Sequence, residues 1–211
     1  MSDLHFGTET PAVCVALRAL IDEQDPGALI VSGDLTQRAK PSEFEAAAQF
    51  LHDAAQGRAL LAVPGNHDLP LFRFVERAAA PYRLFSRHFG SAGRVQCHDL
   101  GAFRLVLIDT TRVFRHKRGT LDEEQVAHVE AALTSAPHKA VCAVVCHHPL
   151  PAFSDQGERF RGAFASELMA ETAVERWAQA GLDLVFCGHT HHARVLRLTS
   201  AHAHTHTPWL I

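Results

Sequence analysis

The stretch Ala59-Leu60-Leu61-Ala62-Val63-Pro64-Gly65-Asn66-His67-Asp68 passes from a short apolar run directly into a glycine turn and three polar side chains. An apolar run of this length, bounded by turn residues, is typical of a buried β-strand. The polar groups follow its carboxyl end, where loops build ligand sites in parallel sheets. A plain Asx-turn loop is the alternative interpretation of the same residues. The rest of the chain bears on this choice, because the pattern recurs.

Four further apolar runs are predicted to be buried strands, at residues 28–31, 103–108, 140–146 and 182–187. Amphipathic stretches separate the runs. Helices are predicted there, at residues 11–24, 42–56, 121–136 and 166–180. Strands that alternate with helices indicate an α/β fold with a largely parallel sheet. No repeat or linker interrupts the pattern, so residues 1–211 are expected to form a single domain.

Local signals suggest where three of these helices begin or end. Ser42-x-x-Glu45 and Thr120-x-x-Glu123 match the capping box, in which a hydroxyl and a carboxylate satisfy each other's free backbone amides. Gly181 follows the fourth helix and is predicted to be its C-terminal cap. Residues 69–99 show no clear period, and we expect a helical part followed by an excursion over the site.

The composition of the chain limits the partners it can have. Its formal net charge is −3, so it lacks the basic surface that a nucleic-acid polymer requires. No run approaches the roughly 18 apolar residues of a membrane span, and no charged and then apolar leader opens the chain. The five cysteines have no CxxC spacing, which suits thiols in a reducing compartment. We therefore expect a soluble, cytoplasmic protein that binds neither membrane nor nucleic-acid polymer.

Polar clusters recur along the chain, mostly directly after apolar runs. They are Asp3-Leu4-His5, Gly33-Asp34, Gly65-Asn66-His67-Asp68, His147-His148-Pro149 and Gly188-His189-Thr190-His191. Each has a plain alternative when taken alone, because Asp-x-His is common, Gly-Asp is often a turn and a histidine at a strand end is often a core residue. The carboxyl ends of parallel strands meet at one edge of a sheet, so we expect these side chains to converge. Imidazole and carboxylate bind divalent transition metals, and their convergence predicts a two-metal hydrolytic centre.

Spacing separates the stronger candidates from the weaker ones. Asp3 and His5 are two residues apart, as are His189 and His191, so each pair shares one face of an extended segment. Neighbours in sequence face opposite ways in such a segment. His148 and His192 are therefore expected to point away from the site.

The ordered set of motifs resembles the calcineurin-like metallophosphoesterase superfamily. Three longer strings resemble its cyclic-nucleotide phosphodiesterase-like (class III) branch: Ser2-Asp3-Leu4-His5-Phe6-Gly7, Ser32-Gly33-Asp34-Leu35-Thr36-Gln37 and Val63-Pro64-Gly65-Asn66-His67-Asp68. The resemblance extends over residues 2–192. It implies a layered sandwich of two mixed sheets flanked by helices.

The resemblance also implies which residues bind metal. One ion would be held by Asp3, His5, Asp34 and His191, and the other by Asp34, Asn66, His147 and His189, with Asp34 as the bridge. Manganese, iron, zinc and cobalt all suit such a mixed set of ligands. A hydroxide that bridges the two ions would be the nucleophile. The substrate implied is a small-molecule phosphodiester, with cyclic nucleotides as one candidate.

Two further residues are candidates for catalysis. In the family pattern His67 follows a ligand without being one, and we expect it to stabilise the phosphate or to protonate the leaving oxygen. Asp68 would orient or charge that imidazole, or would be a plain carboxylate of the loop. Alternative functions are a phosphomonoesterase or phosphoprotein phosphatase, and a binding scaffold without turnover. The scaffold would be expected to lack a ligand or His67, and all of them are present.

Two other segments allow two interpretations each. A third metal site and a solvated edge strand are both compatible with the alternating histidines near the C-terminus, His202, His204 and His206. A basic run could receive a phosphate-bearing substrate or could be a solvated loop before a helix; it comprises Arg112, Arg115, His116, Lys117 and Arg118.

The two ends of the chain depart from the family pattern. Only Met1 and Ser2 precede Asp3, where the family has a β-strand, and the sequence ends at Ile211, where further strands of the second sheet would follow. The first strand and the C-terminal strands are therefore expected to be missing. A shortened sheet leaves an exposed edge, through which the chain could form an oligomer.

Overall fold

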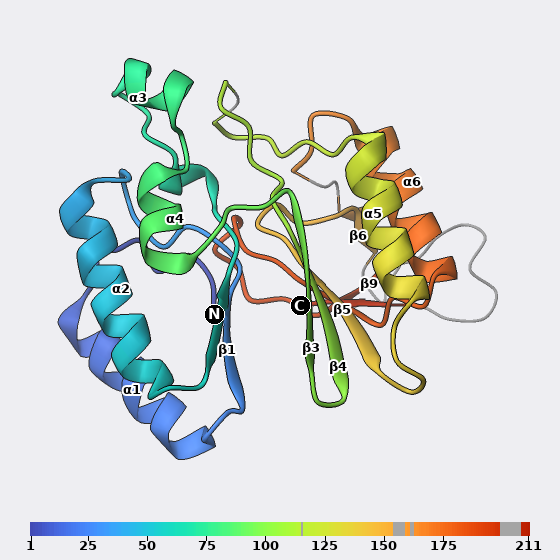
Figure 1. The fold of residues 1–211 in the computed structure, drawn as a ribbon, viewed down its shortest axis with the longest axis horizontal. Coiled ribbons are helices and arrows are strands. Elements are labelled where there is room, and N and C mark those ends of the chain that lie inside the picture. The colour runs from blue at the N-terminus through green and yellow to red at the C-terminus, as the bar shows by residue number, and fades with distance from the viewer. Residues whose placement is uncertain (115, 154–158, 161–162, 199–207) are drawn as a thin grey trace.

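Two β-sheets lie between helices, as Figure 1 shows. The structure is a computed structural model that describes residues 1–114, 116–153, 159–160, 163–198 and 208–211. The smaller sheet pairs β1 (Ala28–Val31) with β2 (Ala59–Ala62) in parallel. In the described part of the chain the larger sheet has eight strands in the order β3-β4-β5-β8-β10-β9-β6-β7.

The larger sheet is parallel at its centre and antiparallel towards its edges. Its strands are β3 (Val95–Leu100), β4 (Phe103–Ile108), β5 (Val141–Val145), β6 (Ala152–Phe153), β7 (Arg159–Phe160), β8 (Leu184–Phe186), β9 (Leu196–Arg197) and β10 (Trp209–Leu210). Strands β4, β5, β8 and β10 pair in parallel, whereas β3 is antiparallel to β4 and β9 is antiparallel to β10. The predicted sandwich of two sheets flanked by helices is therefore confirmed.

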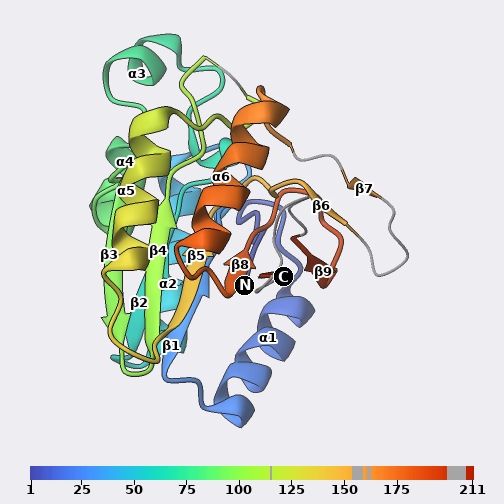
Figure 2. The same cartoon turned by 90° about the vertical axis from the view of Figure 1, so that its right-hand side faces the viewer.

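Helices cover the outer face of each sheet. They are α1 (Pro11–Gln24), α2 (Pro41–Ala55), α3 (Phe74–Ala79), α4 (Arg83–Phe89), α5 (Glu123–Thr134) and α6 (Glu167–Gln179), with a 3₁₀ turn, η1, at Asn66–Asp68. Helices α1, α2 and α4 lie on the side of the smaller sheet, and α5 and α6 on the side of the larger one (Figures 1 and 2).

Strand β4 explains why the predicted strands are apolar on both faces. Leu105 and Leu107 point into a core between the two sheets, together with residues of β2 and β5. Val106 and Ile108 point the other way, into the core under α5 and α6. Side chains alternate along a strand, so a strand covered on both sides is apolar at nearly every position.

The predicted C-terminal cap of α6 is confirmed. Gly181 has a φ of +98°, which favours glycine, and its amide donates to the carbonyl of Ala178. The next amide, that of Leu182, donates to the carbonyl of Trp177 at 2.9 Å. This pair of bonds is the Schellman motif, and it turns the chain directly into the run that leads to β8.

Both predicted capping boxes are wrong, because carboxylates from other positions bind the free amides. Helix α5 begins at Glu123, and the Asp122 carboxylate accepts a hydrogen bond from the Gln125 amide at 3.1 Å. Helix α2 begins at Pro41, and the Glu43 carboxylate accepts from the Lys40 amide. A carboxylate in the first turn is also favoured by the helix dipole.

Residues 69–99 contain a strand in addition to the expected helices. Helices α3 and α4 come first, and β3 then forms a hairpin with β4 in which Val95 lies opposite Ile108. Polar residues such as Gln96 and His98 interrupt β3, which is half-exposed at the sheet edge. Pairing with a buried neighbour, rather than an apolar pattern, stabilises it as a strand.

Candidate metal centre

The polar clusters of the sequence converge where strands of both sheets end. Asp34 follows β1, Asn66 and His67 follow β2, His147 follows β5 and His189 follows β8. These four strands all run in the parallel direction within their sheets, so their carboxyl ends meet at one edge.

Asp3 and His5 reach the same place along the loop that follows β1. The amide of Asp3 donates to the carbonyl of Gly33 at 3.0 Å, and that of His5 donates to the carbonyl of Asp34 at 3.0 Å. Phe6 continues the pairing with Leu35 at 2.9 Å. Backbone hydrogen bonds thus hold the first two candidate ligands beside the third.

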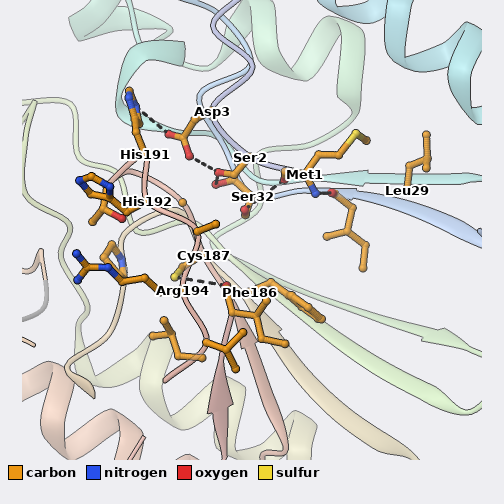
Figure 3. A pocket seen from close by; sticks show the side chains of 18 of the residues that line it. Met1, Ser2, Asp3, Leu29, Ser32, Phe186, Cys187, His191, His192 and Arg194 are labelled. Carbon is orange, nitrogen blue, oxygen red and sulfur yellow. Dashed lines mark hydrogen bonds and ion pairs between the residues drawn. The ribbon is translucent and has the colours of Figure 1, made fainter. Parts of the chain in front are cut away.

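One group of donor atoms, here called cluster A, comprises side chains of Asp3, His5, Asp34 and His191. The His5 Nε2 atom lies 3.1 Å from Nε2 of His191 and 3.8 Å from Oδ2 of Asp34. The Asp3 Oδ1 atom lies 3.4 Å from the His191 nitrogen (Figure 3). Four donors from three separate parts of the chain therefore face one point.

A second group, cluster B, comprises Asp34, Asn66, His147 and His189. The Asn66 Oδ1 atom lies 3.0 Å from Nε2 of His147 and 2.9 Å from Nδ1 of His189. Oδ2 of Asp34, the oxygen that also approaches His5, lies 3.4 Å from Nε2 of His147. Asp34 is therefore the residue that the two clusters share.

These separations fit metal coordination. Donors about 2.1 Å from one ion lie about 3–3.5 Å from each other in octahedral or tetrahedral arrangements. His147 is also oriented as a ligand needs to be, because its Nδ1 lies 2.9 Å from the carbonyl oxygen of Ser32. A carbonyl can only accept, so Nδ1 carries a hydrogen, and in the neutral form of the ring Nε2 keeps a lone pair for a cation.

The backbone at the centre is held in an uncommon conformation. Asp3, His5, Asp34, His189 and His191 all have positive φ values, between 47° and 73°. For residues other than glycine this region is uncommon and costs free energy, and at functional sites it can orient a side chain. Five of the seven predicted metal ligands are therefore aimed by left-handed backbone.

Two glycines are required by close approach rather than by flexibility. A Cβ atom on Gly65 would overlap the backbone amide and carboxylate of Asp34. A Cβ on Gly188 would overlap the side chains of Ser2 and Asp3. Neither position leaves room for any other residue, so both glycines let ligand-bearing segments touch.

The pKa shifts at the centre favour the protonation states in which side chains bind metal. Burial alone would raise the pKa of Asp34, but the hydrogen bond and charge of His147 lower this pKa to about 2. Burial, followed by the charge of His147, lowers the pKa of His189 to about 4. Asp34 is thus a carboxylate and His189 a neutral imidazole at pH 7, which are the forms that bind metal.

His67 lies at the centre without joining either cluster. Its ring centroid is 4.9 Å from that of His5, and its backbone amide donates to Oδ1 of Asp34 at 2.8 Å. Its Nδ1 lies 2.8 Å from the carbonyl oxygen of Gln37 and must donate to it. The neutral ring can then only accept at Nε2, and it becomes a donor there when it is protonated.

Asp68 is buried beneath the centre, where its carboxylate accepts hydrogen bonds from groups of the neighbouring loops. Its carboxylate accepts from the amides of Leu35, Thr36 and Gly65 and from the Thr36 hydroxyl. Burial, followed by the charge of Asp34, raises the pKa of Asp68 to about 6, although the hydrogen bonds act in the opposite direction. Within the described residues, these hydrogen bonds do not include the imidazole of His67.

His148 lies beside the centre, contrary to the expectation that it points away. One of its ring nitrogens lies within 4.8 Å of a ring nitrogen of His147 and of one of His189. Its Nδ1 is 2.8 Å from the Thr110 hydroxyl, and its buried Nε2 has no partner in the described structure. Two adjacent histidines reach one site because the chain leaves the β5 strand before His147, so side chains no longer alternate.

Among the described residues, His192 belongs to neither cluster. His192 is exposed at the surface. His202, His204, His206 and Arg115 lie outside the described residues.

A cavity of about 1210 Å³ adjoins cluster A on the side of helix α1. Asp3 and His191 form part of its wall, and apolar residues such as Leu29 and Phe186 form much of the rest (Figure 3). Open space therefore adjoins the candidate metal centre. None of the described helices is long and apolar enough to cross a membrane.

Comparison with known proteins finds relatives that belong to one family. The family model of the calcineurin-like phosphoesterases matches residues 1–193. The glycerophosphodiester phosphodiesterase GpdQ of Enterobacter lignolyticus is 31% identical over 179 residues, which are 83% of this chain and 60% of that relative. The cyclic adenosine monophosphate phosphodiesterase CpdA of Escherichia coli is 28% identical over 181 residues, or 85% of this chain and 59% of the relative.

The chain thus spans about 60% of the length of the curated relatives it matches. Among solved structures, purple acid phosphatase PPD1 from yellow lupin (Lupinus luteus) seeds superposes with a TM-score of 0.61 at 17% identity. That match covers 85% of this chain and 33% of the lupin protein, and it shows a common fold. The chain belongs to the calcineurin-like phosphoesterase family, in its cyclic-nucleotide phosphodiesterase-like branch.

Proposed function

We propose that this protein hydrolyses small phosphodiesters with the help of two divalent metal ions. The observation that carries the proposal is the position of Asp34, whose Oδ2 atom approaches His147 in cluster B and His5 in cluster A. A shared carboxylate is what a two-metal centre needs, because it holds the ions at a fixed separation. Manganese, iron, zinc and cobalt ions all suit the mixed nitrogen and oxygen donors.

The two clusters would hold one ion each. Asp3, His5 and His191 supply the other ligands of cluster A, and Asn66, His147 and His189 those of cluster B. Bound there, the ions would activate water and neutralise charge on the phosphoryl oxygens. We assign no side chain as nucleophile.

His67 is proposed to act on the substrate directly. Its Nδ1–H is held by the carbonyl of Gln37, so its Nε2 is the atom available to the reacting group. In the protonated form it would donate from Nε2 to a phosphoryl oxygen or to the leaving oxygen. The hydrogen bond from the backbone amide of His67 to the carboxylate of Asp34 keeps this ring next to the proposed metal ligands.

Asp68 is proposed to be a positioning residue. Three of the four hydrogen bonds that it accepts join the turn that carries Asn66 and His67 to the loop that carries Asp34. The fourth, from the Gly65 amide, lies within the turn itself. Of the two roles predicted for it, these contacts favour that of a loop carboxylate. Its effect on His67 would then be indirect, through the loop that contains Gln37.

Diesters are proposed over monoesters because both curated relatives are named as phosphodiesterases. A glycerophosphodiester and a cyclic nucleotide are therefore the first natural substrates to try. A scaffold without turnover is disfavoured, since every predicted ligand and His67 are present and convergent.

The experiment measures metal content per chain together with the hydrolysis of bis(4-nitrophenyl) phosphate and 4-nitrophenyl phosphate. We expect two ions per chain and faster turnover of the diester, lost on chelation and restored by a divalent metal. Two bound ions without turnover of either ester would indicate a scaffold. Preference for the monoester would indicate a phosphatase.

A further inference from the structure

The loop between β4 and α5 carries the basic run of the sequence and is anchored at several points. The amide of Thr120 donates to the carbonyl of Thr110 at 2.9 Å and closes the base of the loop. Gly119 exchanges backbone hydrogen bonds with Ala163 and Ala165 at 2.8 and 2.9 Å. In Figure 1 this yellow-green loop rises at the same end of the molecule as α3.

Arg77 of α3 holds the other arm of the loop. Its Nε donates to the carbonyl of Val113, and its Nη1 donates to the carbonyl of Pro70 at 3.2 Å. The side chain is buried, and among the described residues it has no carboxylate partner. A buried cation without a counter-ion leaves local positive charge beside the loop.

These anchors place His116 against His67. The two ring centroids are 5.3 Å apart, with the rings tilted by 58°. The ring of His67 in turn lies 4.9 Å from that of His5, a ligand of cluster A. The contacts therefore form a continuous row of rings from the metal centre to the loop.

The Nδ1 atom of His116 is a buried polar atom without a hydrogen-bond partner among the described residues. It is shielded from water, and within the described structure it has no partner. Buried polar atoms are seldom left in this state, because an unmade hydrogen bond costs free energy. Nδ1 of His5 and Nε2 of His148 are also buried without a hydrogen-bond partner, so several such nitrogen atoms lie around the centre.

The surroundings of His116 favour an anion. Burial lowers the pKa of its imidazole, and the neighbouring His67, Arg77 and Lys117 lower it further, while only Asp34 acts in the opposite direction. The two fixed cations, Arg77 and Lys117, thus outnumber the one carboxylate, Asp34, around this ring. Groups that carry a phosphodiester charge are attracted to such a place.

We propose that His116 binds the phosphodiester group of the substrate, donating a hydrogen bond to a phosphoryl oxygen beside His67. The inference rests on the proposed function and adds a specificity residue to it. Arg77 is a positioning residue, which acts through the carbonyl of Val113 and the loop. Arg112 of the same run is instead occupied by Asp122 and Gln125.

The test compares the His116→Ala variant with Arg118→Ala, which removes a full charge from an exposed position of the same loop. Inorganic phosphate is titrated into the metal-loaded enzyme by calorimetry, and KM and kcat are measured for bis(4-nitrophenyl) phosphate. We expect His116→Ala to raise the Kd for phosphate and the KM about tenfold, with metal content unchanged. Arg118→Ala should change both by less than about twofold.

The His116→Gln variant keeps a donor of similar reach and guards against a folding defect. It should retain phosphate affinity within about threefold of the wild type. A Kd unchanged in His116→Ala, or raised equally in the Gln variant, would overturn the assignment. Phosphate binding that depends on His116 in an enzyme without diester turnover would contradict the proposed function and leave the contact intact.

The role of Arg77 is tested by a double-mutant cycle. Arg77→Gln should weaken phosphate binding in the wild type but have little further effect in the His116→Ala background, because it acts through that ring. Equal effects of Arg77→Gln in both backgrounds would show that it does not position His116.

Discussion

The Nε2 atoms of His5 and His191 lie 3.1 Å apart, although 186 residues separate them in the sequence. Two neutral imidazoles can share a single hydrogen at this distance, but the carboxylates of Asp3 and Asp34 approach the same point. A cation between these atoms would satisfy all four at once.

Replacing the shared carboxylate should empty the centre. The Asp34→Asn variant keeps an oxygen for the amide of His67 but removes the charge that both clusters use. We expect metal binding at least about 100-fold weaker, measured as metal per chain after dialysis against a defined chelator. Asp53→Asn, on the exposed face of α2, is the matched control. Two ions retained by Asp34→Asn would contradict the bridging role.

Removing His67 should separate catalysis from metal binding. The His67→Ala variant leaves every predicted ligand in place, so metal content should stay the same while turnover falls by about 10²–10⁴-fold. His128→Ala, at an exposed position of α5, serves as the control. A larger loss with poorly activated diesters than with nitrophenyl esters indicates a proton donor to the leaving oxygen. Unchanged turnover of a poorly activated diester would remove His67 from the reaction.

Asp68 should contribute to stability as well as to activity. The Asp68→Ala variant leaves the amides of Leu35, Thr36 and Gly65 without their acceptor, and we expect a loss of about 2–4 kcal/mol in the free energy of unfolding. Urea unfolding measures this change. Thr134→Ala, at an exposed position of α5, should cost about 1 kcal/mol or less. Similar stability of the two variants would show that Asp68 does not join the loops.

The cap of α5 should make stability depend on pH. Burial alone would raise the pKa of Asp122, but hydrogen bonds from the Gln125 amide and from Arg94 lower it. A lowered pKa means that this stabilisation is present above the unfolded value of about 3.9 and is lost as the pH falls through the folded value. At pH 7 the Asp122→Ala variant should lose about 1 kcal/mol.

Unfolding of the metal-free protein isolates this effect from metal loss in acid. The difference between wild type and Asp122→Ala should shrink as the pH drops below about 4. Asp122→Asn, which keeps a capping oxygen, should fall between them at pH 7. A difference that stays constant from pH 7 to pH 3 would show that the charge of Asp122 contributes nothing.

The sequence alone determined the strands of the sandwich core and the candidate residues at their ends. Strand β4 is apolar at nearly every position because both of its faces are covered, and that pattern is visible without coordinates. Polar motifs at strand ends indicated candidate ligands, since parallel strands bring their carboxyl ends together, and the resemblance to the family implied the set of seven. The sequence pattern predicts a strand or helix wherever the burial of its side chains repeats with the period of that strand or helix.

Tertiary structure decided what depends on partners distant in sequence. Strand β3 exists because it pairs with β4, and α5 begins at Glu123 because the Asp122 carboxylate caps it and pairs with Arg94. His116 lies against His67 in a loop whose Val113 carbonyl accepts a hydrogen bond from Arg77, 36 residues away. The physical reason is common to all three. Hydrogen bonds and ring contacts between remote segments leave no period in the sequence, so only the folded chain reveals which groups meet.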